Sequence, residues 1–284
     1  MDLTDFKTIK YLLQKRGLAP QRRFGQNFLI DREALDKITA AADLRPDDIV
    51  LEIGPGLGVL TRELCRRAKK VVAVEFDERM LEILRETTME DCRNLEIVNE
   101  DILKFQPTAY KLQATSYKLV ANLPYNITSA VLRKFLSGEP RPREMVVLVQ
   151  KEVAERIVAA PGEMSLLAVS VQFYGRPAIV DYVFKKSFWP EPEVDSAILK
   201  ISAIGRGISA RLSAAEEVNF FRLVKIGFAA RRKQLQNNLA AGLKLENQAV
   251  REIIVGAGLD AKVRAQDLGL EDWLKLAANS NLSP

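Results

Sequence analysis

The 284-residue chain contains no histidine and only two cysteines, Cys65 and Cys92. Without histidine it cannot form a Ser-His-Asp or Cys-His catalytic system, and it has no imidazole base. Histidine-ligated zinc and iron sites are excluded for the same reason. The two cysteines form no C-x-x-C motif, so neither a zinc finger nor a disulfide framework is expected. We therefore predict no metal site.

Long apolar runs are also missing. No stretch approaches the roughly 18 apolar residues that mark a membrane span, and the N-terminal residues lack the order of a secretory signal. The scarcity of cysteine suits a reducing compartment. These absences predict a cytoplasmic protein with no membrane partner, and nothing in the sequence requires more than a monomer.

The net charge of +5 is unevenly distributed along the chain. Residues 1–23 carry six basic and two acidic side chains, and residues 206–284 carry twelve basic and eight acidic ones. The segment between them, residues 24–205, carries 24 basic and 27 acidic side chains. Basic ends around a mildly acidic middle suggest a polyanionic partner such as a nucleic acid, although solvated helix faces would account for the same charges.

Strand-like and helix-like segments alternate from residue 46 to about residue 150. Short β-branched apolar runs such as IVLEIG at 49–54 are typical of buried parallel strands, whereas the apolar residues of other segments recur with helical spacing. We expect strands at 49–54, 71–76, 95–98, 119–123, 145–149, 178–184 and 196–201, and helices at 57–68, 77–89, 128–136 and 151–159. Residues 165–174 fit either a strand or a helix, and we favour the helix.

This alternation predicts an α/β fold with a Rossmann-like, mostly parallel sheet of seven strands, because βαβ units place parallel strands side by side. The last two strands are joined by a short Pro-rich loop, which allows an antiparallel edge. From residue 214 onward only helix-like segments occur. We therefore predict two domains, residues 1–205 with the sheet and residues 206–284 as a small helical domain.

The motif E-I-G-P-G-L-G at 52–58 closes the first strand and opens the following helix. Glycines at such a turn let a ligand approach the backbone closely. Glu75 ends the second strand, where a carboxylate can accept the two hydroxyl protons of a ribose. A dinucleotide site requires G-x-G-x-x-G, and a triphosphate site requires a Walker lysine, so both fit less well. Together these features favour a cofactor that carries a nucleoside.

The tetrapeptide N-L-P-Y at 122–125 follows the fourth strand of this series, on the carboxyl edge of the sheet where ligands collect in α/β proteins. The Asn122 side-chain oxygen and the Leu123 carbonyl could accept protons from an exocyclic amine, and Tyr125 could stack on a base. The alternative is a strand end followed by an Asn-Pro turn, with a tyrosine that covers the core.

Jointly these motifs resemble those of the ribosomal RNA adenine N6,N6-dimethyltransferases. The F-G-Q-N-F-L segment at 24–29, the glycine motif, Glu75, Asp101 and N-L-P-Y follow the order seen in that family. F-W-P-E-P-E-V-D-S at 188–196 resembles its F-x-P-x-P-x-V-D-S segment, and F-A-A-R-R-K-Q-L at 228–235 resembles its F-x-x-R-R-K-x-L helix. The resemblance covers about residues 20–240 and implies a class I methyltransferase that uses S-adenosylmethionine.

The resemblance implies a cofactor-binding role for five residues in addition to Asn122. Asn27 and Leu29 would close over the methionine end of S-adenosylmethionine. Gly54 would let the cofactor approach, Glu75 would bind its ribose hydroxyls, and Asp101 would bind its adenine amino group.

Three residues are implied at the reacting base. Asn122 would contact both the cofactor and the target adenine. Tyr125 and Phe188 would stack on the two faces of the adenine after it leaves its place in the RNA. For Phe188 alone, a core aromatic residue before a proline turn is the competing interpretation.

Basic side chains near the F-G-Q-N-F-L segment at 24–29, which we call the lid segment, and on the F-x-x-R-R-K helix would contact RNA phosphates, and such contacts weaken as the salt concentration rises. The residues are Arg22, Arg23, Lys225, Arg231, Arg232 and Lys233.

The closest member type dimethylates two adjacent adenosines in a hairpin near the 3′ end of 16S RNA. The resemblance therefore implies 16S rRNA, within the 30S subunit or its precursor, as the partner. Resistance-type enzymes that methylate an adenosine of 23S rRNA share most of the motifs. A non-catalytic RNA-binding assembly factor is a further alternative, as is an NAD-dependent oxidoreductase, which the glycine spacing disfavours.

Overall fold

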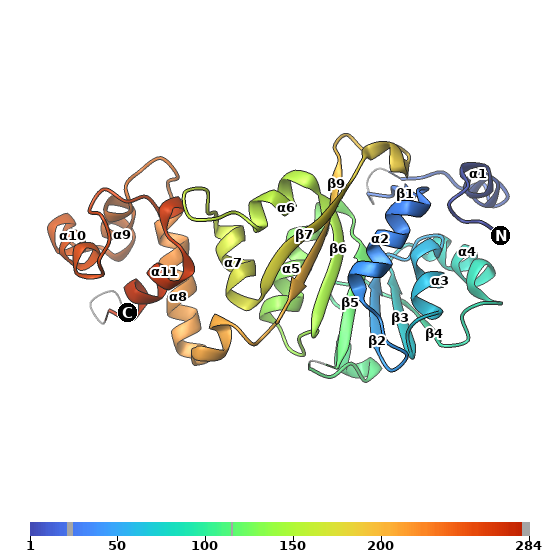
Figure 1. Cartoon of the computed structure of the whole chain (residues 1–284), viewed down its shortest axis with the longest axis horizontal. Coiled ribbons are helices and arrows are strands. Elements are labelled where there is room, and N and C mark those ends of the chain that lie inside the picture. The colour runs from blue at the N-terminus through green and yellow to red at the C-terminus, as the bar shows by residue number, and fades with distance from the viewer. Residues whose placement is uncertain (22–24, 115, 280–284) are drawn as a thin grey trace. The chain divides into compact units, whose positions relative to one another are not determined.

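The computed structural model describes residues 1–21, 25–114 and 116–279. The chain divides into two compact units (Figure 1). The first comprises residues 1–154 and 176–204, and the second comprises residues 155–175 and the chain from residue 205 onward.

A seven-stranded sheet forms the centre of the first unit. Its strands are β2 (Ile49–Ile53), β3 (Lys70–Glu75), β4 (Leu95–Asn99), β5 (Tyr117–Asn122), β6 (Glu144–Gln150), β7 (Arg176–Val183) and β9 (Ser196–Ser202). The order across the sheet is β4-β3-β2-β5-β6-β9-β7. Strands β2 to β6 are parallel, and β9 runs antiparallel between β6 and β7. The predicted α/β fold, with its mostly parallel sheet and antiparallel edge, is confirmed.

Helices α2 (Arg32–Ala42) and α3 (Val59–Cys65) pack on one face of this sheet (Figure 1). Their apolar residues share a buried core cluster with alternate residues of the strands, such as Val50, Val120 and Ile198. Successive strand residues point to opposite faces, so this alternation sets which side chains meet the helices. The first unit also contains α4 (Glu78–Thr88) and α5 (Thr128–Ser137).

The parallel register brings the carboxyl ends of the strands to one edge of the sheet. Ile53 pairs with Val74, and Glu75 pairs with Asn99. Asn122, the last residue of β5, lies beside β6 at the same edge. Neighbouring strands are about 4.8 Å apart, so the motif residues that follow β2, β3, β4 and β5 meet within a few strand spacings.

A small antiparallel sheet joins two segments that are far apart in the sequence. Strand β1 (Phe28–Leu29) pairs with β8 (Phe188–Trp189), with Leu29 opposite Phe188. Two-residue strands carry no hydrophobic periodicity, so neither was predicted. The pairing fixes the F-G-Q-N-F-L segment beside the F-W-P segment.

Helix α1 (Phe6–Gln14) lies in the first unit and buries one face. Its buried residues, among them Ile9, form an apolar cluster with Phe28 of β1 and with Met80 and Ile83 of α4. The N-terminal helix therefore packs against both the lid segment and α4.

The second unit is helical. It contains α7 (Leu166–Tyr174), α8 (Ala214–Gly227), α9 (Leu235–Leu243), α10 (Asn247–Gly256) and α11 (Leu270–Ala277), while α6 (Lys151–Ile157) begins in the first unit and ends in this one. The predicted first domain includes residues 155–175, whereas the structure groups them with the C-terminal helices. The Phe173 and Phe220 rings pack there at 4.7 Å between centroids, and the Gln266 carbonyl accepts the backbone N–H of Met164. Because α7 lies between sheet strands in the chain order, no local pattern reveals this grouping.

Helix α8 ends before the R-R-K triplet. The predicted helix over 228–235 is wrong, because residues 228–234 form turns between α8 and α9. Asn238 Nδ2 donates to the carbonyl of Gly227, the last residue of α8, at 2.6 Å and to the carbonyl of Ala230, in the turn that follows, at 3.1 Å, so one side chain holds both the helix end and the turn. Within the described ranges, no helix combines the length and the apolar character that crossing a membrane requires.

Candidate active site

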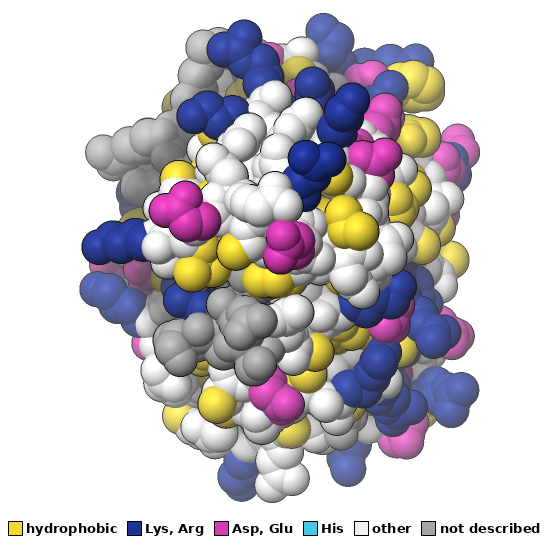
Figure 2. Space-filling view, turned by 90° about the vertical axis from the view of Figure 1, so that its left-hand side faces the viewer, with side chains coloured by type: hydrophobic (Ala, Val, Ile, Leu, Met, Phe, Trp, Pro, Cys, Tyr) yellow, Lys and Arg dark blue, Asp and Glu magenta, His cyan; other side chains and the backbone are white. Residues whose placement is uncertain are grey.

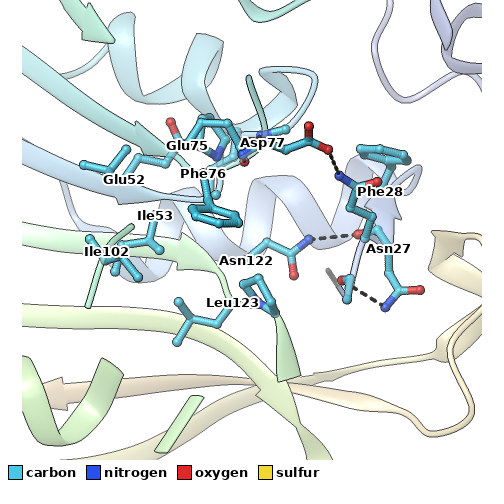
Figure 3. A pocket seen from close by; sticks show the side chains of 18 of the residues that line it. Asn27, Phe28, Glu52, Ile53, Glu75, Phe76, Asp77, Ile102, Asn122 and Leu123 are labelled. Atoms are coloured by element: carbon cyan, nitrogen blue, oxygen red, sulfur yellow. Dashed lines mark hydrogen bonds between the residues drawn. The ribbon is translucent and has the colours of Figure 1, made fainter. Parts of the chain in front are cut away.

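The turn between β2 and α3 forms one wall of a cavity of about 320 Å³ in the first unit (Figure 3). Gly54 has a φ of 64° and Gly58 a φ of 87°, in the left-handed region that favours glycine. A Cβ on Gly58 would lie 3.0 Å from the Leu84 side chain and 3.1 Å from Thr87 Oγ1. The turn can therefore pack this closely against α4 only with glycine at that position.

Glu75 ends β3 and lines the cavity. Its Oε1 accepts the N–H of Asp77 at 2.8 Å, and its Oε2 accepts the N–H of Gly56 at 3.2 Å. Burial raises the pKa of Glu75, although the two N–H donors act in the opposite direction. Each carboxylate oxygen keeps a further lone pair, so the group can also accept hydroxyl protons from a ligand.

Glu52 lines the same cavity from β2 and is fully buried. Burial raises the pKa of Glu52 to about 8, so the side chain is mostly protonated and neutral at pH 7. Its Oε2 is shielded from solvent and forms no hydrogen bond of normal geometry in the part of the chain that the structure describes, although the nearby Thr61 side chain opposes the rise in pKa.

The remaining walls are mainly apolar. Ile53, Ile102 and Leu123 line the cavity together with Phe76, whose side chain is 61% exposed (Figure 3). Asp101 lies at the rim, and its Oδ1 accepts the N–H of Leu103 at 2.9 Å. Phe76 was not predicted; the signal that could have found it is an aromatic residue directly after the acidic end of a strand.

Asn122 connects the sheet edge to the lid segment, as Figure 3 shows. Its Nδ2 donates to the Asn27 carbonyl at 3.2 Å, which leaves the side-chain oxygen to accept a proton from another group. Gln26 Nε2 donates to Asp77 Oδ2 at 2.9 Å and so ties the lid to the loop after β3. Gln26 was also missed, because only the tertiary fold brings it to Asp77.

Tyr125 lines the cavity directly after N-L-P. Its phenol oxygen lies 2.6 Å from Ser196 Oγ, at the start of β9. Burial raises the pKa of Tyr125, although the Ser196 hydrogen bond opposes this. The phenol therefore stays protonated near pH 7, and its ring is held in place by a residue of β9.

The cavity combines polar groups at several points with apolar walls. Such a set fits a ligand with a ribose, a planar base and a polar end, as in the cofactor that the sequence resemblance implies. Among the described residues, no cluster of three or more Asp, Glu or Cys side chains is placed to hold a metal ion.

A model of the family described as ribosomal RNA adenine dimethylase matches residues 18–281. The chain belongs to this family. It is 47% identical over 271 residues to the ribosomal RNA small subunit methyltransferase A of Dehalococcoides mccartyi strain BAV1. The aligned region covers 94% of this chain and 90% of that relative. The protein of the same name from Moorella thermoacetica is 39% identical over 276 residues, with 94% of both chains covered.

Two solved structures show the same fold as this rRNA adenine dimethylase. A dimethyladenosine transferase from Plasmodium falciparum has a TM-score of 0.73 at 29% identity and covers 87% of this chain and 95% of its own. The 23S rRNA methyltransferase ErmE has a TM-score of 0.72 at 31% identity and covers 88% of this chain and 98% of its own. Because the two scores are nearly equal, the fold alone does not separate small-subunit from 23S methyltransferases.

Phe188 of the dimethylase lies in the core and not in the cavity. Its side chain is 3% exposed and packs in the cluster that contains Leu29. Leu29 itself is buried and lines the cavity, as the lid prediction requires. The structure does not bring the Phe188 ring to Tyr125, so stacking by Phe188 stays a prediction that requires the ring to turn out of the core.

The predicted RNA-binding residues fall in three places. Arg22 and Arg23 lie outside the described residues. Lys225 is exposed on α8, and the Arg231–Lys233 triplet is exposed in the turns after that helix. In Figure 2 basic side chains form several separate groups with acidic and apolar side chains between them. Charge on this face therefore does not by itself define a binding surface.

Proposed function

We propose that this chain transfers methyl groups from S-adenosylmethionine to N6 of two adjacent adenosines in a hairpin near the 3′ end of 16S rRNA, during assembly of the small ribosomal subunit. The hydrogen bond between Asn122 and the Asn27 carbonyl carries the chemical part of the proposal, because it sets an amide oxygen at the mouth of the cavity. The relatives named ribosomal RNA small subunit methyltransferase A support the choice of substrate.

The cofactor would lie along the carboxyl edge of the sheet. Glu75 would accept the ribose hydroxyl protons, and Asp101 would accept from the adenine amino group. Phe76 offers an exposed ring and Ile102 an apolar surface against which the adenine would pack. Leu29, in the lid segment, would cover the methionine end. When bound, S-adenosylmethionine supplies a methyl group that its sulfonium has already activated.

The target amine needs orientation and proton acceptors more than a strong base, because its lone pair is delocalised into the adenine ring. The Asn122 side-chain oxygen and the Leu123 carbonyl would accept hydrogen bonds from its two N–H groups. These contacts would point the nitrogen lone pair toward the cavity. Holding the reacting groups in line in this way can lower the activation free energy by about 7 kcal/mol or more. The absence of histidine is consistent with this chemistry.

Tyr125 would hold the flipped adenine by stacking. Removal of a base from its RNA stack costs a few kcal/mol, and an aromatic ring that stacks on it offsets about 1–3 kcal/mol. Because Ser196 fixes the phenol, the ring would be in position before the base arrives. The exposed Arg231–Lys233 triplet of the second unit would contact phosphates and position the RNA.

The test is transfer of labelled methyl groups to 30S subunits that lack the modification, followed by digestion of the RNA and mass analysis of its nucleosides. We expect N6,N6-dimethyladenosine in 16S rRNA. Parallel reactions contain 50S subunits. Label only in 23S rRNA would move the assignment to the type of methyltransferase that ErmE is named for, and no label with folded protein would favour a non-catalytic RNA-binding protein.

A further inference from the structure

Helix α1 presents aromatic and basic side chains on its exposed face. Phe6 is 40% exposed and Tyr11 is 59% exposed, and Lys7 and Lys10 lie between them. Residues four apart are neighbours on a helix, so Phe6 lies beside Lys10, and Lys7 lies beside Tyr11. The Lys10 ammonium is 5.9 Å from the centre of the Phe6 ring, within range of a cation–π contact. The helix itself contains no acidic residue.

The other cations near this helix are already neutralised. Lys15 pairs with Glu86 of α4 at 3.0 Å, and Arg16 pairs with Glu86 and with Glu82. These ion pairs anchor the end of α1 to α4. In contrast, Lys7 and Lys10 form no ion pair with any residue that the structure describes. Asp5 caps the start of α1 and its carboxylate partly balances Lys7, so the two lysines together leave the exposed face with a net positive charge of about one.

Helix α1 packs against the candidate active site with its buried side, where Ile9 lines the cavity. A helix is about 10 Å across with its side chains, so the exposed face is turned away from the cavity at about that distance. The Phe6 ring contacts the Trp189 ring at 5.3 Å between centroids, and Trp189 pairs with Phe28 of the lid. The match to the family model begins at residue 18, so α1 lies outside it.

We propose that the exposed face of α1, formed by Phe6, Lys7, Lys10 and Tyr11, binds unpaired nucleotides of the substrate RNA that flank the target adenosine. This rests on the proposed function, which makes RNA the substrate. Unpaired bases stack on exposed aromatic side chains with little sequence preference, and lysines between such side chains contact the phosphates. The face would hold the flanking strand within reach of the cavity.

Two other occupants fit less well. An amphipathic helix that binds a membrane needs a free apolar face, but Ile9, Leu12 and Leu13 of α1 are buried in the protein core. A second copy of the chain would need a larger apolar patch, whereas two lysines separate the exposed rings. Single exposed aromatic residues need no explanation. Here two of them flank two lysines that form no ion pair with the described residues, on a helix that packs against the cavity, which favours a nucleic acid.

The test measures binding to 30S subunits that lack the modification, over a range of salt concentrations, for Lys7→Glu, Lys10→Glu, the double variant and Tyr11→Ala. We expect the double variant and Tyr11→Ala each to bind about tenfold or more weakly. Each lost phosphate contact should lower the slope of log affinity against log salt by about 0.7. Because these side chains face solvent, the affinity for S-adenosylmethionine, measured by calorimetry, should stay at the wild-type value.

Lys69→Glu is the matched control, because Lys69 is exposed and precedes β3 at the opposite edge of the sheet. Its RNA affinity and salt slope should stay near wild type. Equal losses of RNA affinity in Lys69→Glu and Lys10→Glu would show that the affinity depends on the net charge of the protein and not on this face, and would overturn the proposal. Wild-type affinity in the α1 variants would also overturn it, as would a change in their oligomeric state without a change in RNA binding.

The outcomes also separate this proposal from the proposed function. If the wild-type protein methylates 16S rRNA and the α1 variants do so with unchanged affinity, only the role of α1 fails. If the wild-type protein methylates no rRNA but binds 30S subunits through this face, the assigned reaction fails and the surface stands.

Discussion

The Asn122 amide has two ends with different partners, and two substitutions separate them. Its Nδ2 donates to the Asn27 carbonyl at 3.2 Å, and its oxygen is left for a proton of the target amine. Asn122→Ala removes both ends. Asn122→Asp keeps an acceptor of the same shape but cannot donate to the lid.

The expected magnitudes follow from these contacts. One neutral hydrogen bond to the lid contributes about 0.5–1.5 kcal/mol, so Asn122→Ala should weaken cofactor binding by no more than about tenfold. A preorganised polar contact at the reacting centre is worth about 2.7–4 kcal/mol, which corresponds to a rate loss of about 100- to 1000-fold. Turnover should therefore fall much further than cofactor affinity. Asn122→Asp should lose as much cofactor affinity but retain more turnover than Asn122→Ala.

The assay compares the cofactor dissociation constant, from calorimetry, with the single-turnover rate of methyl transfer to 30S subunits at saturating cofactor and RNA. Asn247→Ala, which changes an exposed asparagine of the second unit, is the control and should behave as wild type. Wild-type turnover in Asn122→Ala would refute the role of the amide oxygen. Equal turnover in Asn122→Ala and Asn122→Asp would refute the separation of the two ends.

Three further predictions follow from other contacts. Ser196→Ala and Tyr125→Phe each break the hydrogen bond that fixes the Tyr125 ring, so each should lower turnover about tenfold; additive losses in the double variant would contradict this. Burial raises the pKa of Glu52 from 4.5 to about 8, so the folded protein holds a proton that the unfolded chain releases. Its stability should fall by about 1.4 kcal/mol per pH unit between those values, and thermal melts of Glu52→Gln should lack that slope; parallel curves would count against it. Replacement of the Arg231–Lys233 triplet by alanine should lower the salt slope of RNA binding by about 2 without changing cofactor affinity, and an unchanged slope would argue against that surface.

The strands and the chemistry at their ends could be predicted because both depend on local patterns. A β-branched apolar run such as Ile49–Ile53 needs only its own residues to favour a buried parallel strand. Once five such runs are parallel, Glu75 and Asn122 must reach the same edge of the sheet, whatever the details of packing. The candidate cavity therefore lies where the sequence motifs predict it.

Contacts between distant segments could not be predicted in this way. The pairing of β1 with β8 involves two residues on each side, and Gln26 meets Asp77 across the lid. Neither leaves a periodic signal. Asn238, which lies on the next helix, donates to the carbonyls of Gly227 at the end of α8 and of Ala230 in the turn after it. The helix expected over 228–235 rests on the family resemblance alone, and no local pattern reveals this contact.

Hydrophobic periodicity and motifs within a few residues are enough to predict the fold class, the positions of the strand ends and the residue types available for chemistry. The burial of Phe188, the contact of Ser196 with Tyr125 and the exposed face of α1 emerge only when the chain is folded. Burial and hydrogen-bond partners depend on which side chains from distant segments fill the core. Those segments come from the whole first unit, and the missing histidine only limits which chemistry the resulting site can perform.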